Sequence, residues 1–164
     1  MSKLDELIKE LCPDGVEYVP LWKITIWDKK FNSVVREKQP NIIKYNYFLA
    51  AELKTLECEN GTVKILTTSA TDLWANYEDV IDTFSEREIV CIPWGGNPIV
   101  QYYKGKFITS DNRIAIAKDE SNLNTKYLYY CLQNRISEIV SFYRGSGIKH
   151  PDMSKVLDMV IPLP

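Results

Sequence analysis

The sequence predicts a mixed α+β fold that is rich in strands, with an N-terminal helix and a long helix in the C-terminal half. Three observations point to it: apolar residues at helical spacing near the N-terminus, a cluster of strand-like runs between residues 89 and 117, and a second helical pattern after residue 125. The chain has 164 residues, 45% of them apolar and 26% charged. These values are ordinary for one globular domain of about 100–200 residues, so we expect residues 1–164 to form a single domain.

The N-terminal half is predicted to begin with a capped helix. Ser2 and Asp5 have the spacing of a capping box, and the apolar positions of residues 4–11 fit one helix face. A turn, a short strand over 16–21 and a polar loop over 27–41 should follow. Residues 46–56 fit either a strand or a short helix.

A hairpin is predicted further on, because Asn60-Gly61 favours a type I′ turn between residues 56–58 and 63–66. Residues 67–88 are polar and irregular.

The second half is predicted to contain short strands and then the long helix. Four strand-like runs occupy residues 89–94, 99–103, 107–109 and 113–117. Glycine-containing turns at 95–98 and 104–106 separate the first three runs. Apolar residues from 125 to 143 recur at helical spacing and predict one helix, which the segment 144–147 ends. A helical turn after Pro151 and an extended segment over 160–164 complete the chain.

Composition and motifs exclude several classes of protein. No apolar run reaches the roughly 18–20 residues of a membrane span, and no signal-peptide pattern opens the chain, so we expect a cytoplasmic protein. The four cysteines form no CxxC and are predicted to be reduced and buried. A single histidine, His150, excludes sites that need two imidazoles. Neither a phosphate-binding Walker loop nor a dinucleotide fingerprint is present.

No catalytic residue and no metal ligand is predicted. Asp111, Glu120 and Glu138 offer carboxylates for nuclease or glycosidase chemistry, but no spacing singles out two of them. The net charge is −2, yet residues 99–149 carry eight basic and four acidic side chains. Such a stretch fits a surface that follows a phosphate backbone, and it fits an ordinary solvated face equally well.

The remaining candidates suit binding. Residues 94–97 place Trp94 and Asn97 around two glycines that allow close approach of a ligand, although a packed tryptophan at a turn has the same pattern. Residues 144–150 place cations, a hydroxyl and an imidazole on a loop, where the cations also complement a helix C-terminus. Lys104 and Lys106 are predicted at a hairpin tip. Ser69 and Thr71 lie in the polar segment, where an exposed loop is expected.

The sequence resembles the target recognition domain of type I restriction-modification specificity (S) subunits over nearly its whole length. The segments that carry the resemblance, in the family's order, are Leu11-Cys12-Pro13-Asp14-Gly15-Val16-Glu17-Tyr18-Val19-Pro20-Leu21, Ile92-Pro93-Trp94-Gly95-Gly96-Asn97, Lys104-Gly105-Lys106-Phe107, Ser110-Asp111-Asn112, residues 126–132, Gly145-Ser146-Gly147-Ile148-Lys149-His150-Pro151 and Ile161-Pro162-Leu163-Pro164. The glycine-rich segment before Pro151 and the closing segment are the most specific of these.

The resemblance implies a non-catalytic role in recognition of double-stranded DNA. S subunits carry two recognition domains separated by long helices, and each domain reads one half of a split sequence. Modification subunits transfer a methyl group from S-adenosylmethionine to adenine, and a restriction subunit uses ATP and magnesium. This chain is thus expected to hold no cofactor itself, because those cofactors belong to the partner subunits. It ends where a spacer helix would be expected to follow, so we expect either a fragment of a subunit with a second recognition domain or a half-sized subunit that forms a homodimer.

DNA contacts divide into those that fix position and those that choose sequence. We expect phosphate contacts from Arg144, Lys149, Lys104 and Lys106. We expect base contacts from Ser69, Thr71, Trp94, Asn97, Ser146 and His150. Two alternatives stay open: a protein-interaction module without DNA contact, whose exposed aromatic side chains serve a partner, and a small metal-dependent nuclease.

Overall fold

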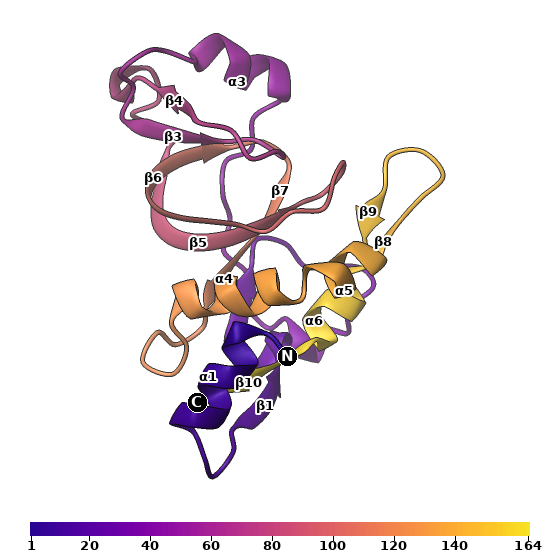
Figure 1. Ribbon diagram of the computed structural model, residues 1–164. Helices are drawn as coiled ribbons and strands as arrows, with labels where there is room; N and C mark the ends of the chain where they lie inside the picture. The colour runs from indigo at the N-terminus through magenta and orange to yellow at the C-terminus, as the bar shows by residue number, and fades with distance from the viewer.

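A strongly curved six-stranded sheet lies between one short helix and a layer of several helices (Figure 1). The computed structural model describes residues 1–164. The strand order is β2-β7-β5-β6-β3-β4, and every neighbouring pair is antiparallel except β3 and β6. The strands are β2 Thr25–Trp27, β3 Val63–Leu66, β4 Leu73–Ala75, β5 Ser85–Pro93, β6 Gln101–Thr109 and β7 Asn112–Ala117. This mixed sheet with segregated helices confirms the predicted α+β class.

Strands β5, β6 and β7 curl into a barrel-like wall. β5 pairs with β6 from Ser85↔Phe107 to Cys91↔Gln101, and it pairs with β7 at its other edge, up to Pro93↔Asn112. Only a tight turn separates β6 from β7, so β5 must bend to pair with both (Figure 1). Buried apolar side chains from four of the strands fill the inside, among them those of Leu66, Ile89, Phe107 and Ile114.

The predicted turn at residues 104–106 is wrong. Gly105 adopts a φ of +140° within β6 and pairs with Arg87, so the strand continues through it. A Cβ at Gly105 would lie 3.1 Å from the Tyr103 hydroxyl, and glycine avoids that contact. The glycine therefore bends a long strand instead of reversing the chain, and it leaves Lys104 and Lys106 in mid-strand.

The predicted hairpin around Asn60 is also wrong, because the residues before Asn60 do not pair with β3. Asn60 does adopt a positive φ of 60°, but residues before it form helix α3 (Ala50–Leu56), which settles the ambiguity over 46–56. Glu57 then bridges to Ala75, while β3 pairs with β4 and β6. The long-range pairing with β6 outweighs the local turn preference.

The helical layer covers the side of the sheet opposite α3. Its helices are α1 Lys3–Leu11, α2 Leu21–Ile24, α4 Thr125–Asn134, α5 Ile136–Ser141 and α6 Met153–Asp158. Short 3₁₀ turns η1 (Arg36–Lys38) and η2 (Tyr77–Asp79) lie in the connections. Two further ribbons complete the fold, β1 (Glu17–Pro20) with β10 (Val160–Leu163) and β8 (Tyr143–Arg144) with β9 (His150–Pro151).

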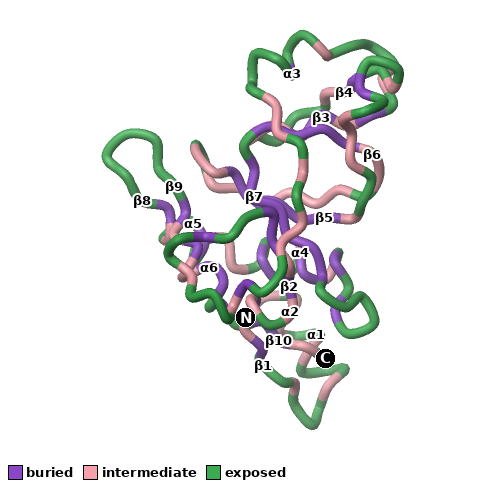
Figure 2. Tube along the Cα trace, turned by 180° about the vertical axis from the view of Figure 1, so that it is seen from behind, coloured by how far each residue is buried: buried purple, intermediate pink, exposed green.

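The helix predicted over 125–143 is present as two helices. Arg135 leaves the helical region (φ −109°, ψ 28°), and its guanidinium donates to the Val160 carbonyl. The break lets Ile139 of α5 join Leu128 and Leu132 of α4 in the main core. Figure 2 shows the buried positions concentrated in the sheet and these helices, and the loop between β8 and β9 exposed along its length.

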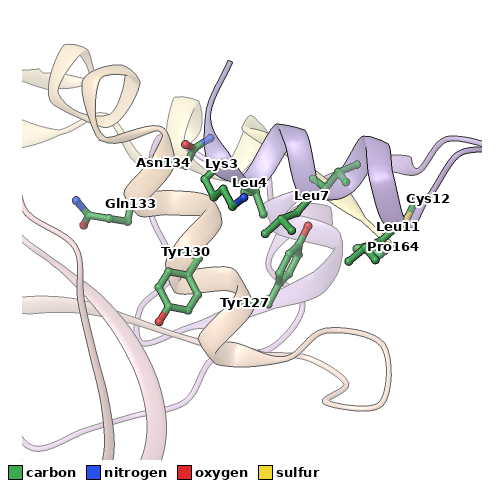
Figure 3. A pocket seen from close by; sticks show the side chains of 11 residues that line it. Lys3, Leu4, Leu7, Leu11, Cys12, Tyr127, Tyr130, Gln133, Asn134 and Pro164 are labelled. Carbon is green, nitrogen blue, oxygen red and sulfur yellow. The ribbon is translucent and has the colours of Figure 1, made fainter.

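Helix α1 has the predicted capping box and an unusual environment. The Asp5 amide donates to Ser2 Oγ (3.1 Å), and the Ser2 amide donates to the Asp5 carboxylate (3.0 Å). No α1 residue is buried. Its apolar stripe faces Tyr127 and Tyr130 of α4 across a groove of about 630 Å³ (Figure 3). This groove lies at the end of the molecule away from the β8–β9 loop (Figure 1).

The cysteine prediction holds only in part. All four cysteines are free, and Cys91 and Cys131 are buried as predicted, but Cys58 is exposed and Cys12 is half-buried. Cys58 follows α3 at the edge of the small β3–β4 unit, where no element covers it. None of the helices combines the length and the apolar character that crossing a membrane requires.

Candidate nucleic-acid interface

Two loops that are far apart in the sequence project to the same side of the molecule and contact each other (Figure 1). We call residues 94–100, between β5 and β6, the tip, and residues 145–149, between β8 and β9, the hairpin loop. The His150 ring at the base of this loop stacks on Trp94, with centroids 5.0 Å apart and planes 27° apart. Ile148 of the hairpin loop approaches Gly95 so closely that a Cβ there would lie 2.7 Å from Ile148 Cγ2. The structure thus brings together the two loops that the sequence singled out.

A hydrogen bond fixes the histidine ring. His150 Nδ1 lies 2.5 Å from the Trp94 carbonyl oxygen. A carbonyl oxygen only accepts, so Nδ1 carries the proton and donates it. Nε2 is then the nitrogen that remains for a ligand. The ring is exposed, so this nitrogen sits at the surface between tip and hairpin loop.

Arg113 supports Trp94 from below. Its guanidinium carbon lies 5.3 Å from the centroid of the Trp94 ring and 5.3 Å from that of the Tyr47 ring. Tyr47, Arg113, Trp94 and His150 therefore form a continuous series of ring and cation contacts, which we call the four-residue stack. A cation between two aromatic faces is stabilised by both ring quadrupoles, more strongly where water is excluded. Arg113 is only 2% exposed, so the stack is shielded from water at Arg113.

Two carboxylates neutralise the buried guanidinium. Arg113 Nη2 lies 2.5 Å from Asp111 Oδ1, and Arg113 Nε lies 3.7 Å from Asp28 Oδ2. The Asp28 side chain is fully buried, and its Oδ1 accepts a hydrogen bond from the Ile114 amide (3.1 Å). Burial raises the pKa of Asp28 to about 6, although the nearby Arg113 cation works in the opposite direction. The ion pair beneath Trp94 is therefore sensitive to proton uptake below neutral pH.

The loop between β3 and β4 is tied to the same end of the sheet. Gln101, where the tip joins β6, and Asn112, at the start of β7, both donate side-chain hydrogen bonds to the Thr67 carbonyl (3.0 Å each). Within this loop the Thr67 hydroxyl donates to the Ser69 carbonyl (2.8 Å), and Lys64 Nζ donates to the Thr71 carbonyl (2.8 Å). Ser69 and Thr71 thus lie exposed on an ordered loop near the base of the tip.

The other predicted residues divide into two groups. Asn97 on the tip and Arg144, Ser146 and Lys149 on the β8–β9 ribbon are all exposed, and neither cation among them forms an ion pair. The remaining two, Lys104 and Lys106, are not brought to this surface.

Lys104 and Lys106 instead interact with other parts of the sheet. Lys104 Nζ lies 3.6 Å from Glu88 on the neighbouring strand. Lys106 Nζ lies 5.3 Å from the centroid of the Tyr77 ring. Because β6 continues through Gly105, these side chains point from its middle and not from a hairpin tip.

The residues beneath and beside the tip could not be predicted as site residues from the sequence. Arg113 appeared as a strand residue and Tyr47 as part of an ambiguous segment, and no local pattern connects them. Lys29, Lys30 and Lys44 lie in or just after the segment interpreted only as a polar loop, and they surround a hollow next to Tyr47. The doublet Lys29-Lys30 was the one local signal that favoured a basic surface here.

Comparisons with known proteins agree on one family. The family model for the type I restriction modification DNA specificity domain matches residues 41–164. Among solved structures, the S subunit of a type I restriction-modification system from M. genitalium is similar with a TM-score of 0.61 and 16% identity. That match covers 90% of this chain and 34% of the S subunit. At this identity the likeness concerns the fold, and the chain spans about a third of the subunit's length. No curated protein sequence matches the chain significantly.

Proposed function

The chain belongs to the family of type I restriction modification DNA specificity domains, and from this premise we propose that its tip and hairpin loop read the sequence of double-stranded DNA. The observation that carries the proposal is the contact between these loops. A stacked tryptophan–histidine pair joins them, and exposed Asn97, Ser146 and Lys149 surround it. Amide, hydroxyl and imidazole groups pair with base edges in the major groove, where each base pair offers a distinct pattern of donors and acceptors.

We further propose that the domain directs the chemistry of other subunits and performs none itself. In this proposal it reads one half of a split site, and modification subunits methylate adenine with S-adenosylmethionine. A restriction subunit supplies ATP- and magnesium-dependent cleavage, and a second recognition domain or a second copy reads the other half. This division of recognition and catalysis between subunits fits the candidate interface, whose aromatic, polar and cationic side chains suit binding.

The contacts at the base of the loops support this role. Sequence choice requires donors and acceptors that are held within a few tenths of an ångström of their productive positions. The His150–Trp94 hydrogen bond and the buried Arg113 hold the base of the tip, and Gln101 and Asn112 hold the neighbouring loop. The outermost side chains stay exposed above this support, where a base edge can reach them.

The test is a methylome. The chain is expressed with its cognate modification subunits in a host without adenine methylation, and adenine methylation is read across the genome. We expect a new split motif that depends on the presence of the chain. An assembled complex that binds S-adenosylmethionine but adds no motif would favour the protein-interaction alternative. Magnesium-dependent cleavage of DNA by the purified chain alone would favour the nuclease alternative.

A further inference from the structure

Three lysines gather around a hollow beside the four-residue stack. The hollow has a volume of about 390 Å³, and Lys29, Lys30 and Lys44 line it together with Tyr45 and Tyr47. All three lysines are exposed. None of them forms an ion pair, whereas Lys38, Lys64 and Lys104 each pair with a carboxylate. The three ammonium groups are therefore available to a partner from outside the chain.

The carboxylate in the wall of this hollow does not cancel the positive charge. Asp28 is the acidic residue that lines it, and its side chain is fully buried beneath the surface. Its Oδ2 faces the Arg113 guanidinium and its Oδ1 accepts from the Ile114 amide. Arg113 thus compensates this carboxylate from the inner side, and the three lysines present an excess of positive charge toward solvent.

The hollow is continuous with the candidate interface through one ring. Lys29 Nζ lies 5.4 Å from the centroid of Tyr47, and the Arg113 guanidinium lies 5.3 Å from the same ring. Arg113 in turn supports Trp94, which carries His150. These contacts place Lys29 Nζ within about 16 Å of the Trp94 ring, which is about half a helical turn of B-DNA, so one duplex can reach both.

We propose that Lys29, Lys30 and Lys44 form a second cationic surface that holds backbone phosphates of the duplex next to the bases read by the tip. This inference rests on the proposed function, and it replaces Lys104 and Lys106 as the expected source of phosphate contacts. Lysine binds phosphate as a compact charge with three donors and little sequence preference. The surface therefore adds affinity and orientation, while the tip and hairpin loop choose the sequence.

The experiment measures DNA affinity against salt concentration for the chain assembled with its modification subunits. Lys29→Ala, Lys30→Ala and Lys44→Ala are compared with Lys54→Ala, which changes an exposed lysine on α3 that does not line the hollow. Removal of one phosphate-binding ammonium group should flatten the slope of log affinity against log salt by about 1 and weaken binding roughly fivefold at 0.15 M salt. Lys54→Ala should change neither value. Lys44→Arg should keep most of the affinity because it keeps the charge.

The outcomes separate this inference from the proposed function. Equal weakening for cognate and non-cognate duplexes, with an unchanged methylation motif, supports the phosphate-contacting surface. Variants that bind like Lys54→Ala while the wild-type complex binds DNA would overturn this inference alone. A relaxed motif in Lys44→Ala would also overturn it, because the lysine would then read bases. A wild-type complex without DNA affinity would overturn the proposed function and this inference together.

A free phosphate ligand is distinguished by its effect on stability in the absence of DNA. If the hollow is a site for a small phosphate compound, millimolar inorganic phosphate at constant ionic strength should raise the unfolding temperature of the wild type and not that of Lys44→Ala. We expect inorganic phosphate to stabilise the wild type no more than chloride does at the same ionic strength. Thermal unfolding of all variants controls for folding, and exposed substitutions of this kind should change stability by less than about 0.5 kcal/mol.

Discussion

Replacement of Arg113 with methionine should weaken the candidate interface from beneath. Methionine is long and flexible and should fill much of the space that the Arg113 side chain occupies beside the Tyr47 and Trp94 rings. The stabilisation that the variant loses is therefore mainly electrostatic. The guanidinium is 2% exposed, and it neutralises the fully buried Asp28 as well as Asp111. Without it, Asp28 would be a buried charge with no cation beside it, a situation that proteins avoid by proton uptake.

Proton uptake limits the cost of this change. The pKa of Asp28 is already raised to about 6, so holding its proton at pH 7 requires only about 1.4 kcal/mol. The two cation–π interactions that methionine cannot make should contribute roughly 1–2 kcal/mol, and the pair with the exposed Asp111 carboxylate less than about 1 kcal/mol. We therefore expect Arg113→Met to lower the free energy of unfolding by about 3 kcal/mol at pH 7, within the range for a broken buried pair.

Urea unfolding at pH 5 and pH 7 tests this reasoning. Because the folded pKa of Asp28 lies above its unfolded value, its carboxylate costs nothing below about pH 4 and destabilises the fold as pH rises through about 6. At pH 5 Asp28 is mostly protonated in the wild type, so the loss in Arg113→Met should be about 1 kcal/mol smaller than at pH 7. In an Asp28→Asn background this pH dependence should vanish. An equal loss at both pH values, or a loss below about 1 kcal/mol, would refute the reasoning.

Two glycine substitutions give further expectations. Gly95→Ala should push Ile148 away, because the new Cβ would lie 2.7 Å from the end of that side chain. We expect this variant to lose less than about 1 kcal/mol of stability but to methylate a relaxed motif. The double variant Gly95→Ala, Ile148→Ala should recover the strict motif. A strict motif in Gly95→Ala would show that the contact is dispensable. Gly61→Ala should cost about 1–3 kcal/mol because its Cβ would lie 2.6 Å from the rigid Ala75 carbonyl oxygen. Gly147→Ala is the control in thermal unfolding, because a Cβ there would meet open space. Equal stability of Gly61→Ala and Gly147→Ala would contradict the expected cost at Gly61.

The sequence predicted correctly those helices and strands that are determined by residues close together in the chain. The α1 helix has its capping box and apolar stripe within ten residues, and the strand predicted over 113–117 carries its apolar run within itself. The path of β6 could not be predicted in this way. Gly105 is a turn signal by itself, and only the pairing with β5, which includes Arg87↔Gly105, keeps the chain extended there.

The two loops of the candidate site were predicted from their unusual composition. The glycine-rich segments at 94–97 and 145–147 stood out because few structural roles need glycine next to polar and aromatic groups. The four-residue stack could not be predicted, because Tyr47, Arg113 and His150 come from separate parts of the chain that only the tertiary fold brings together. Phosphate contacts were assigned to Lys104 and Lys106 from a turn that does not exist.

The most direct measurement is a comparison of methylomes between the wild-type chain and variants of its loops. Asn97→Ala and Ser146→Ala are each expressed with the cognate modification subunits in a host without adenine methylation, with Lys54→Ala as the control. We expect Lys54→Ala to give the wild-type split motif and each loop variant to lose discrimination at one or two base pairs within a single half, at a cost of roughly 1–3 kcal/mol per position. Loop variants that assemble and methylate the unchanged motif would contradict the claim that these two loops read DNA sequence.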